Sequence, residues 1–370
     1  MNHPIDHTIS GSSEEFRSDE FQVTQIGVGG DFYYEGAMAR FMTQFGMYSQ
    51  TTPRNDPSAS RGQWNLDNAY RYISEAYGGY HLNWMAGLNI QAGIFMSYVG
   101  LWSYYNFDNW TYQPSYVSSN TPWFFNGYRI QWFPTEHLKI EPWFVNGWQA
   151  YGVFNKEPGY GIQVRWWPDD SFSILGNQYT GTDDLGFKSR RRFHTDDSAM
   201  VRYYENKEAL VDRMAACVTF DYGFETGDGV SANKQYFVGF MAYDRTWFYH
   251  NLFAFTVGGG WINNPGRYLV LEPPINGATA ASGSPAFTEN PGDPFKAWDF
   301  QLTTDYMPTE NVTFRLEFTR RFANVPYWSG QGGVTPVGGN TGAPGSIPAG
   351  FTPDLVKSEN ILSFAMMVRF

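Results

Sequence analysis

Charged side chains that alternate with apolar ones are the residues of this chain best placed to do chemistry. In "NVTFRLEFTRRF", Arg315 and Glu317 alternate with Phe314, Leu316 and Phe318. Charges on one face of a strand can line an aqueous channel, where opposed acidic and basic rows tune selectivity. In a soluble protein the same charges would form solvent-exposed cross-strand pairs. The candidates for a pore lining are Arg129, Lys139, Glu141, Arg165, Arg213, Asp221, Asp299, Asp305, Arg315 and Glu317.

Catalytic, metal and cofactor sites find no support in the sequence. The chain has no Gly-x-Ser-x-Gly motif that would mark a nucleophilic serine. Of its 6 histidines only His3 and His7 are spaced i, i+4, and they fall in a predicted loop rather than on a helix, so they do not indicate a helical zinc site. The single cysteine, Cys217, excludes an intrachain disulfide and metal clusters built on paired thiols. We therefore predict no enzyme activity, no catalytic residue, no metal and no cofactor.

Charge elsewhere in the chain argues against nucleic acid as a partner. The net charge is −11, and the only dense basic run is "KSRRRFHTDD" at 188–197. Binding to nucleic acid phosphates draws on clustered Lys and Arg. The basic run could contact lipopolysaccharide phosphates, but a solvated loop end closed by ion pairs is the simpler explanation.

The composition is that of a protein without an ordinary charged surface. Charged residues make up 16% of the chain and aromatic residues 19%, whereas soluble domains have about 25% charged residues. A membrane-spanning helix needs about 20 consecutive apolar residues, and every apolar run here is interrupted within a few positions. A membrane protein with this composition must therefore be a β-barrel, the other fold that satisfies every backbone group in lipid.

Apolar residues fall on every second position in many segments, which is the period of a half-buried strand. We predict strands at 20–34, 37–49, 70–80, 85–98, 122–133, 138–149, 158–167, 171–182, 191–206, 210–224, 234–247, 251–262, 296–306, 311–322 and 359–370. Their connections alternate between short turns and longer loops rich in Gly, Pro, Asn and Ser. This alternation is typical of an outer-membrane barrel with its long loops outside the cell. The prediction is a single antiparallel transmembrane barrel over 1–370, with long external loops at 263–295 and 323–358.

Strand parity leads to a further expectation about the N-terminus. Bacterial single-chain barrels have an even number of strands, and the pattern shows one strand fewer than sixteen. The last strand runs toward the short-turn side, and counting back, the first visible strand starts on the long-loop side. We therefore expect one more strand upstream of this sequence, with residues 1–19 as the remainder of the first external loop.

The chain ends on an apolar strand face. In "ENILSFAMMVRF" every second side chain is apolar, from Leu362 to the terminal residue. The terminal aromatic resembles the C-terminal signal by which the insertion machinery recognises outer-membrane proteins. The residues assigned to this signal are Phe364, Met366, Val368 and Phe370.

The middle of the chain resembles the OmpL-like β-barrel porins of Gram-negative bacteria. The similarity lies in the order of its parts: "EAY" entering a strand, the strand "LNIQAGIF", an aromatic, Asn-rich loop, and then "VNGW". The opening "NHPIDHT" followed by "RSDEFQVTQIGV" also resembles that family. The resemblance implies an outer-membrane channel, and the family has no catalytic residues to assign here.

Three functions remain open on the sequence alone. The first is an outer-membrane porin for ions and small hydrophilic solutes, embedded in lipid and lipopolysaccharide, with homo-oligomers possible. Its net charge predicts a weak cation preference, unless the basic residues Arg129, Arg165, Arg213 and Arg315 cluster at the narrowest point. The second is a soluble all-β carbohydrate-binding protein or glycosidase that uses its Trp residues as sugar platforms. The third is a plugged outer-membrane barrel with an enzymatic or adhesive role. Conductance of the folded protein would separate the first from the other two.

Overall fold

Alternation along each strand places polar side chains on the inner face of the sheet and apolar ones on the outer face. In β14 (Val312–Ala323), Arg315 and Glu317 are 2% and 1% exposed, whereas Leu316 between them is 50% exposed. A soluble sandwich has the opposite arrangement, with apolar residues filling the space between its sheets. The pattern seen here is that of a barrel whose outer face contacts lipid.

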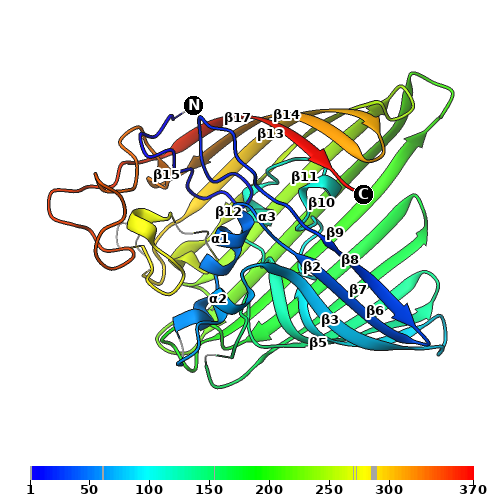
Figure 1. The fold of residues 1–370 in the computed structure, drawn as a ribbon, viewed down its shortest axis with the longest axis horizontal. Helices are drawn as coiled ribbons and strands as arrows, with labels where there is room; N and C mark the ends of the chain where they lie inside the picture. The colour runs from blue at the N-terminus through cyan, green and yellow to red at the C-terminus, as the bar shows by residue number, and fades with distance from the viewer. Residues whose placement is uncertain (1, 61, 154, 270, 272, 285–289) are drawn as a thin grey trace.

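The structure is a computed structural model, and it describes all residues except 1, 61, 154, 270, 272 and 285–289. Part of the predicted loop 263–295 therefore lies outside the described residues. Fifteen strands pair antiparallel in one sheet that curls into a barrel (Figure 1), which confirms the predicted fold class. In sheet order the strands are β1 (Gly29–Tyr34), β2 (Ala37–Thr43), β3 (Ile73–Leu82), β4 (Leu88–Met96), β5 (Phe124–Thr135), β6 (Leu138–Val145), β7 (Gly159–Asp169), β8 (Phe172–Gly181), β9 (Arg191–Glu205), β10 (Val211–Thr226), β11 (Tyr236–Phe248), β12 (Phe253–Asn263), β13 (Lys296–Thr309), β14 and β17 (Ser358–Val368).

The two ends of the barrel differ in the length of their connections. At the short-turn end, Glu35 and Gly36 join β1 to β2 with φ of 48° and 85°, the geometry of the two-residue turn that fits the twist of a hairpin. Among the described residues, no helix has the length and apolar character needed to cross a bilayer. The remaining elements belong to the long connections: α1 (Tyr48–Arg54), α2 (Leu66–Tyr70), α3 (Tyr116–Ser119), the 3₁₀ helices η1 (Pro57–Ser60), η2 (Asn106–Asp108), η3 (Pro265–Arg267) and η4 (Ile275–Gly277), and the paired strands β15 (Trp328–Ser329) and β16 (Leu355–Val356).

Two predicted strands are much shorter than their sequence pattern suggested. The strand predicted at 20–34 begins only at Gly29, and within 20–28 the chain makes one isolated bridge, from Ile26 to Phe45. The strand predicted at 37–49 ends at Thr43, and α1 follows it. Gly46, with φ of 85°, turns the chain out of the ladder between them. Apolar alternation continues across this turn, so the period alone could not locate the end of the strand.

The sheet has two free edges, β1 and β17. Within the part of the chain that the structure describes, no ladder joins these two strands. We refer to the gap between them as the seam. Unpaired backbone groups are costly in lipid, so a strand that pairs with both edges would complete the wall.

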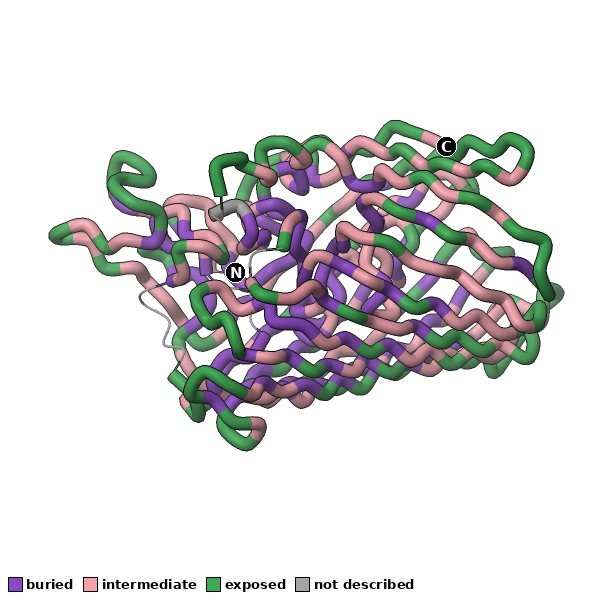
Figure 2. Tube along the Cα trace, turned by 90° about the horizontal axis from the view of Figure 1, so that it is seen from below, coloured by how far each residue is buried: buried purple, intermediate pink, exposed green. Residues whose placement is uncertain are grey.

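Buried residues gather in one half of the barrel. In Figure 2 they crowd the end that carries the long loops, while the walls of the other half are mostly half-buried or exposed. The largest buried cluster contains many aromatic side chains, among them Phe95, Tyr98, Trp143 and Phe237. We call these two parts the packed half and the open half.

Candidate functional site

Residues 99–121, which connect β4 to β5, fold into the interior of the barrel. We call this segment the inner loop. Its helix α3 contacts β11, β12 and β13. The buried carboxylate of Asp299 accepts hydrogen bonds from the Ser115 hydroxyl at 3.0 Å and from the Tyr116 N–H at 2.5 Å. Asp299 thus fixes the start of α3 against the wall.

A second carboxylate holds the backbone of the inner loop just before α3. Glu317 accepts hydrogen bonds from the N–H groups of Tyr112 at 2.7 Å and Gln113 at 2.8 Å. Hydrogen bonds from N–H groups to an ionised carboxylate are stronger than those between neutral groups. Because Glu317 is 1% exposed, these bonds also satisfy a charge that water cannot reach.

Arginines of the wall hold the carbonyl groups of the inner loop. Arg245 donates to the carbonyl oxygen of Trp110 at 3.0 Å, and Arg315 donates to that of Asn109 at 2.8 Å. Asp305 joins the two arginines, since its carboxylate lies 2.7 Å from a guanidinium nitrogen of each. The result is a buried network of three charges that fastens the loop to β11, β13 and β14.

The N-terminal segment also lies inside the barrel. Arg321 of β14 donates to the carbonyl oxygen of Gly11 at 2.9 Å, and Ser363 of β17 donates to Glu15. Glu14 is buried beside them, and burial raises its pKa to about 8, an effect that a hydrogen bond from Ser13 only partly offsets. The segment therefore carries acidic groups that the folded barrel favours in their neutral form.

The raised pKa of Glu14 predicts that the folded protein becomes less stable as the pH rises from about 4.5 to about 8. The folded-state pKa of about 8 lies above the ordinary value of 4.5, so the stability that its neutral form contributes is complete below about pH 4.5 and is lost as pH rises through 8. We expect Glu14→Gln to reduce the fall in the free energy of unfolding between pH 5 and pH 9, measured by urea unfolding in micelles. The control is Glu20→Gln, because Glu20 lies outside the core beside Arg17 and its pKa is lowered. Equal pH profiles for wild type and Glu14→Gln would contradict the prediction.

The wall opposite the inner loop carries an excess of positive charge. Glu141 lies 2.8 Å from the Lys139 ammonium and 3.7 Å from the Arg129 guanidinium. Arg165 stands directly opposite Lys139 in the ladder of β6 and β7. Among the described residues no carboxylate forms an ion pair with Arg165, whose guanidinium lies over the Trp167 ring at 5.3 Å. Two basic groups therefore share one carboxylate, and a third, Arg165, stands beside them.

The ten residues predicted to line a pore fall into separate groups on the inner face. Arg213 lies over the Trp247 ring at 4.1 Å, and Asp221 is buried on β10. Asp299, Asp305, Arg315 and Glu317 lie beneath the inner loop, and Arg129, Lys139, Glu141 and Arg165 share the opposite wall. Their role in solute passage stays a prediction.

Sequence reasoning missed Arg245 and Arg321, although both had a detectable signal. In "MAYDRTWF" Arg245 shares its parity with Met241, Tyr243 and Trp247, all of which face inward. Alternation could have placed both arginines on the inner face. It could not have shown that each holds a backbone carbonyl of a distant segment.

A comparison with protein families identifies the family of this chain and the membrane in which it lies. The family model "Putative beta-barrel porin-2, OmpL-like" matches residues 1–370, the whole chain. The chain belongs to this family. It is an outer-membrane porin, as the resemblance in its central segment implied, and the soluble carbohydrate-binding alternative is set aside. No curated protein matches the chain.

Solved structures similar to this OmpL-like porin are also outer-membrane proteins. The anion-selective porin from Comamonas acidovorans has a TM-score of 0.52 at 9% identity, with 94% of this chain and 89% of that chain covered. In-vitro folded OmpT from Vibrio cholerae has a TM-score of 0.49 at 8% identity, covering 93% and 88% of the two chains. OprD from Pseudomonas aeruginosa has a TM-score of 0.39 at 10% identity, covering 77% and 63%. At these identities the similarity shows the fold alone.

The proposed insertion signal of this OmpL-like porin lies at the free edge of the sheet. β17 ends at Val368, and two residues follow it. Phe364 is 71% exposed on the outer face, in line with the other apolar residues of that face. The residues predicted as the signal, Phe364, Met366, Val368 and Phe370, are all exposed. Recognition by the insertion machinery stays a prediction.

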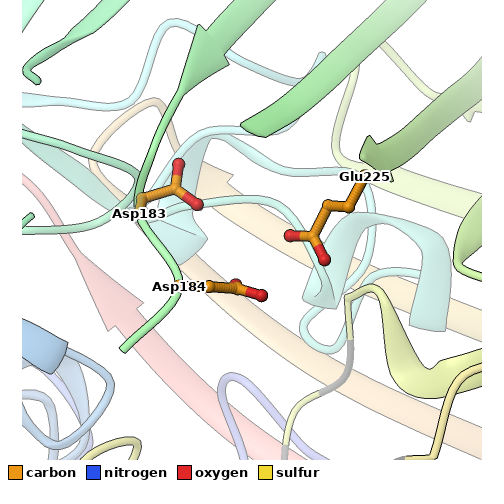
Figure 3. A group of neighbouring side chains, drawn as sticks. All are labelled: Asp183, Asp184 and Glu225. Atoms are coloured by element: carbon orange, nitrogen blue, oxygen red, sulfur yellow. The ribbon is translucent and has the colours of Figure 1, made fainter. Parts of the chain in front are cut away.

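Three carboxylates near the mouth of the porin form a group that could suit a metal ion by its spacing. Asp183, Asp184 and Glu225 each offer an oxygen within 4.8 Å of the others (Figure 3). Arg192 lies among them, at 2.8 Å, 3.1 Å and 2.9 Å from their oxygens, and Arg190 pairs with Asp184 at 3.0 Å. The guanidinium groups neutralise the cluster, and the basic run at 188–197 is thereby closed by ion pairs.

Proposed function

We propose that this porin passes small hydrophilic solutes by passive diffusion and prefers anions. The observation that carries the proposal is the charge of the wall formed by β5, β6 and β7, where Glu141 pairs with Arg129 and Lys139 while Arg165 stands opposite Lys139 in the ladder. Arg129 and Lys139 are 15% and 16% exposed, and Arg165 is more exposed, so all three reach the space inside the barrel. Basic side chains that line a pore favour anions over cations.

The net charge of the whole chain supports the opposite preference. At −11 it favours cations, but several carboxylates that contribute to it are paired inside the wall. Asp305 is neutralised by two arginines, and Glu225 by Arg192. Screening limits the reach of exposed charges to about 8 Å at physiological salt. For this reason we base the proposed ion preference on the charges that line the interior of the barrel and not on the net charge of the whole chain.

Reversal potentials in a KCl gradient across planar bilayers test the proposal. We expect the wild type to be anion-selective and Arg165→Glu to shift the reversal potential toward cation selectivity. Lys188→Glu is the matched control, because it changes the net charge equally but lies exposed in a loop outside the strands. Cation selectivity in the wild type, or an equal shift in the control, would overturn the proposal.

A plugged barrel is the second candidate, and the packed half supports it. The buried aromatic cluster of that half includes side chains of the inner loop such as Tyr116 and Val117. The folded protein in a planar bilayer should conduct if the porin interpretation holds for the isolated chain, and it should be silent if the plug is complete. We propose no enzyme activity and no cofactor in either case. Contacts with lipopolysaccharide and association with further copies stay predictions from the sequence.

A further inference from the structure

The N-terminal segment forms a small hairpin whose turn lies inside the barrel. Thr8 and Arg17 form an antiparallel bridge, and the N–H of Ile9 donates to the carbonyl oxygen of Phe16 at 3.0 Å. Beyond these pairs the chain turns back on itself, and residues 10–16 are all buried. We call residues 10–16 the tip. The two arms of the hairpin hold the tip together as one unit.

Hydrogen bonds hold the tip between the inner loop and the wall. The hydroxyl oxygens of Ser13 and of Ser119 in the inner loop lie 3.0 Å apart. The N–H of Glu14 donates to the side-chain oxygen of Gln113 at 3.2 Å. On the other side, β14 and β17 donate to the tip the two hydrogen bonds described above. The tip therefore occupies space between the inner loop and these two strands.

The tip brings two carboxyl groups, Glu14 and Glu15, to a part of the wall that is already acidic. The basic side chain that faces them is Arg321, which is 0% exposed and pairs with Glu359 at 3.6 Å. Glu317 lies near both carboxyl groups of the tip. The other titratable groups around the tip and its arginine are Asp299, Tyr48, Tyr104 and Tyr112. With both tip residues ionised, one guanidinium would face an excess of negative charge.

Burial keeps the two carboxyl groups of the tip in their neutral form. It raises the pKa of Glu14 to about 8 from an ordinary 4.5, and it also raises the pKa of Glu15, where the Glu317 carboxylate adds to the effect. The three tyrosines stay neutral because burial raises their pKa above the ordinary value of 10. A tip released into water would have ordinary carboxyl groups. The ratio of inserted to released tip therefore falls about tenfold per pH unit for each carboxyl, from about pH 4.5 up to its pKa in the barrel.

We propose that the tip is a gate, which leaves the barrel when Glu14 and Glu15 lose their protons. Two buried carboxylates without counter-ions of their own are costly, whereas water solvates them once the tip is released. Release widens the passage between the inner loop and strands β14 and β17. The proposal rests on the proposed function, because it concerns the regulation of conduction through this porin.

Single-channel conductance in planar bilayers at pH 5 and pH 9 tests the gate. We expect the wild type to conduct several-fold more at pH 9 and to return to its first level when the pH is lowered again. Glu14→Gln/Glu15→Gln should conduct alike at both pH values, because neither side chain can ionise. Glu20→Gln is the matched control, since Glu20 lies exposed beyond the tip beside Arg17, and it should behave as the wild type does. A wild type without a rise, or an equal rise in the double variant, would overturn the gate.

A disulfide across the tip separates its movement from other effects of pH. Ser13→Cys/Ser119→Cys places two thiols where the hydroxyl oxygens lie 3.0 Å apart, which brings them close enough to be joined. Peptide mass spectrometry confirms the bond, because the chain also contains Cys217. The oxidised form should keep its low conductance at pH 9, and the reduced form should rise as the wild type does. A rise with the disulfide intact would show that the tip is not the gate.

The sign of the reversal potential, measured in the same bilayers, distinguishes failure of the gate from failure of the proposed function. An anion-selective channel whose conductance is equal at both pH values overturns the gate alone. Cation selectivity with a pH-dependent conductance overturns the ion preference alone. A protein that is silent at pH 5 and conducts at pH 9 supports the gate, and one that is silent at both overturns the gate and passive diffusion together.

Discussion

Replacement of residues 98–122 by a short Asn-Gly turn is expected to raise the single-channel conductance several-fold. β4 and β5 are already paired up to Met96 and Phe124, and the N–H of Ser97 donates to the carbonyl of Trp123 at 3.0 Å. A two-residue turn can therefore close this hairpin without disturbing the ladder. The variant removes the segment that fills much of the packed half, and conductance rises with the free cross-section of the narrowest part.

The measurement is the conductance of single channels in planar bilayers. Deletion of 337–339 is the control, because these residues are exposed in another long loop and their removal should leave conductance unchanged. If the variant without the inner loop conducts as the wild type does, the inner loop is not the restriction. A silent wild type together with a conducting variant would identify the inner loop as the plug.

Asp305→Ala is expected to cost the largest amount of stability of any single substitution in the wall. Asp305 is 0% exposed and accepts hydrogen bonds from Arg315 at 2.7 Å and 2.8 Å and from Arg245 at 2.7 Å. Without it, two buried guanidinium groups lose their counter-ion. Removing one partner of a buried ion pair costs about 3–5 kcal/mol, and the carbonyl contacts of both arginines to the inner loop would be weakened as well.

Urea unfolding of the protein in micelles, followed by tryptophan fluorescence, measures this loss. The matched control is Asp31→Ala, because Asp31 pairs with Arg40 at 2.7 Å but its side chain is 69% exposed. An exposed ion pair contributes about 0–1 kcal/mol. The prediction fails if the two substitutions change the free energy of unfolding by similar amounts.

The strands were predictable because the alternation of apolar and polar residues within each one is visible in its own short segment of sequence. Phe314, Leu316 and Phe318 face lipid while the charged residues between them face inward, and this period needs no knowledge of the rest of the chain. All fifteen predicted strands overlap strands of the sheet. The largest errors in the strand bounds occur at β1 and β2, and after β2 a glycine turn interrupts a continuing period.

The course of the inner loop was not predictable in this way. Its position depends on contacts such as Gln113 with Glu317 and Asn109 with Arg315, whose partners lie about 200 residues away in the sequence. No local pattern distinguishes a loop that folds inward from one that extends outward. For the same reason the alternation identified Asp299 and Glu317 as inward-facing but could not show that a loop covers them.

The contacts of the inner loop and the N-terminal segment with β17 and the residues after it bear on the order in which the barrel assembles. The inner loop reaches the last residues of the chain, where Arg369 pairs with Asp108 and lies over the Phe107 ring at 4.6 Å. Glu15 meets Ser363 across 348 positions of sequence. Contacts so distant in sequence form late in folding, because the chain must first close a very large loop. The channel should therefore pass through a wide intermediate, and it should narrow only after its final strand has joined the wall.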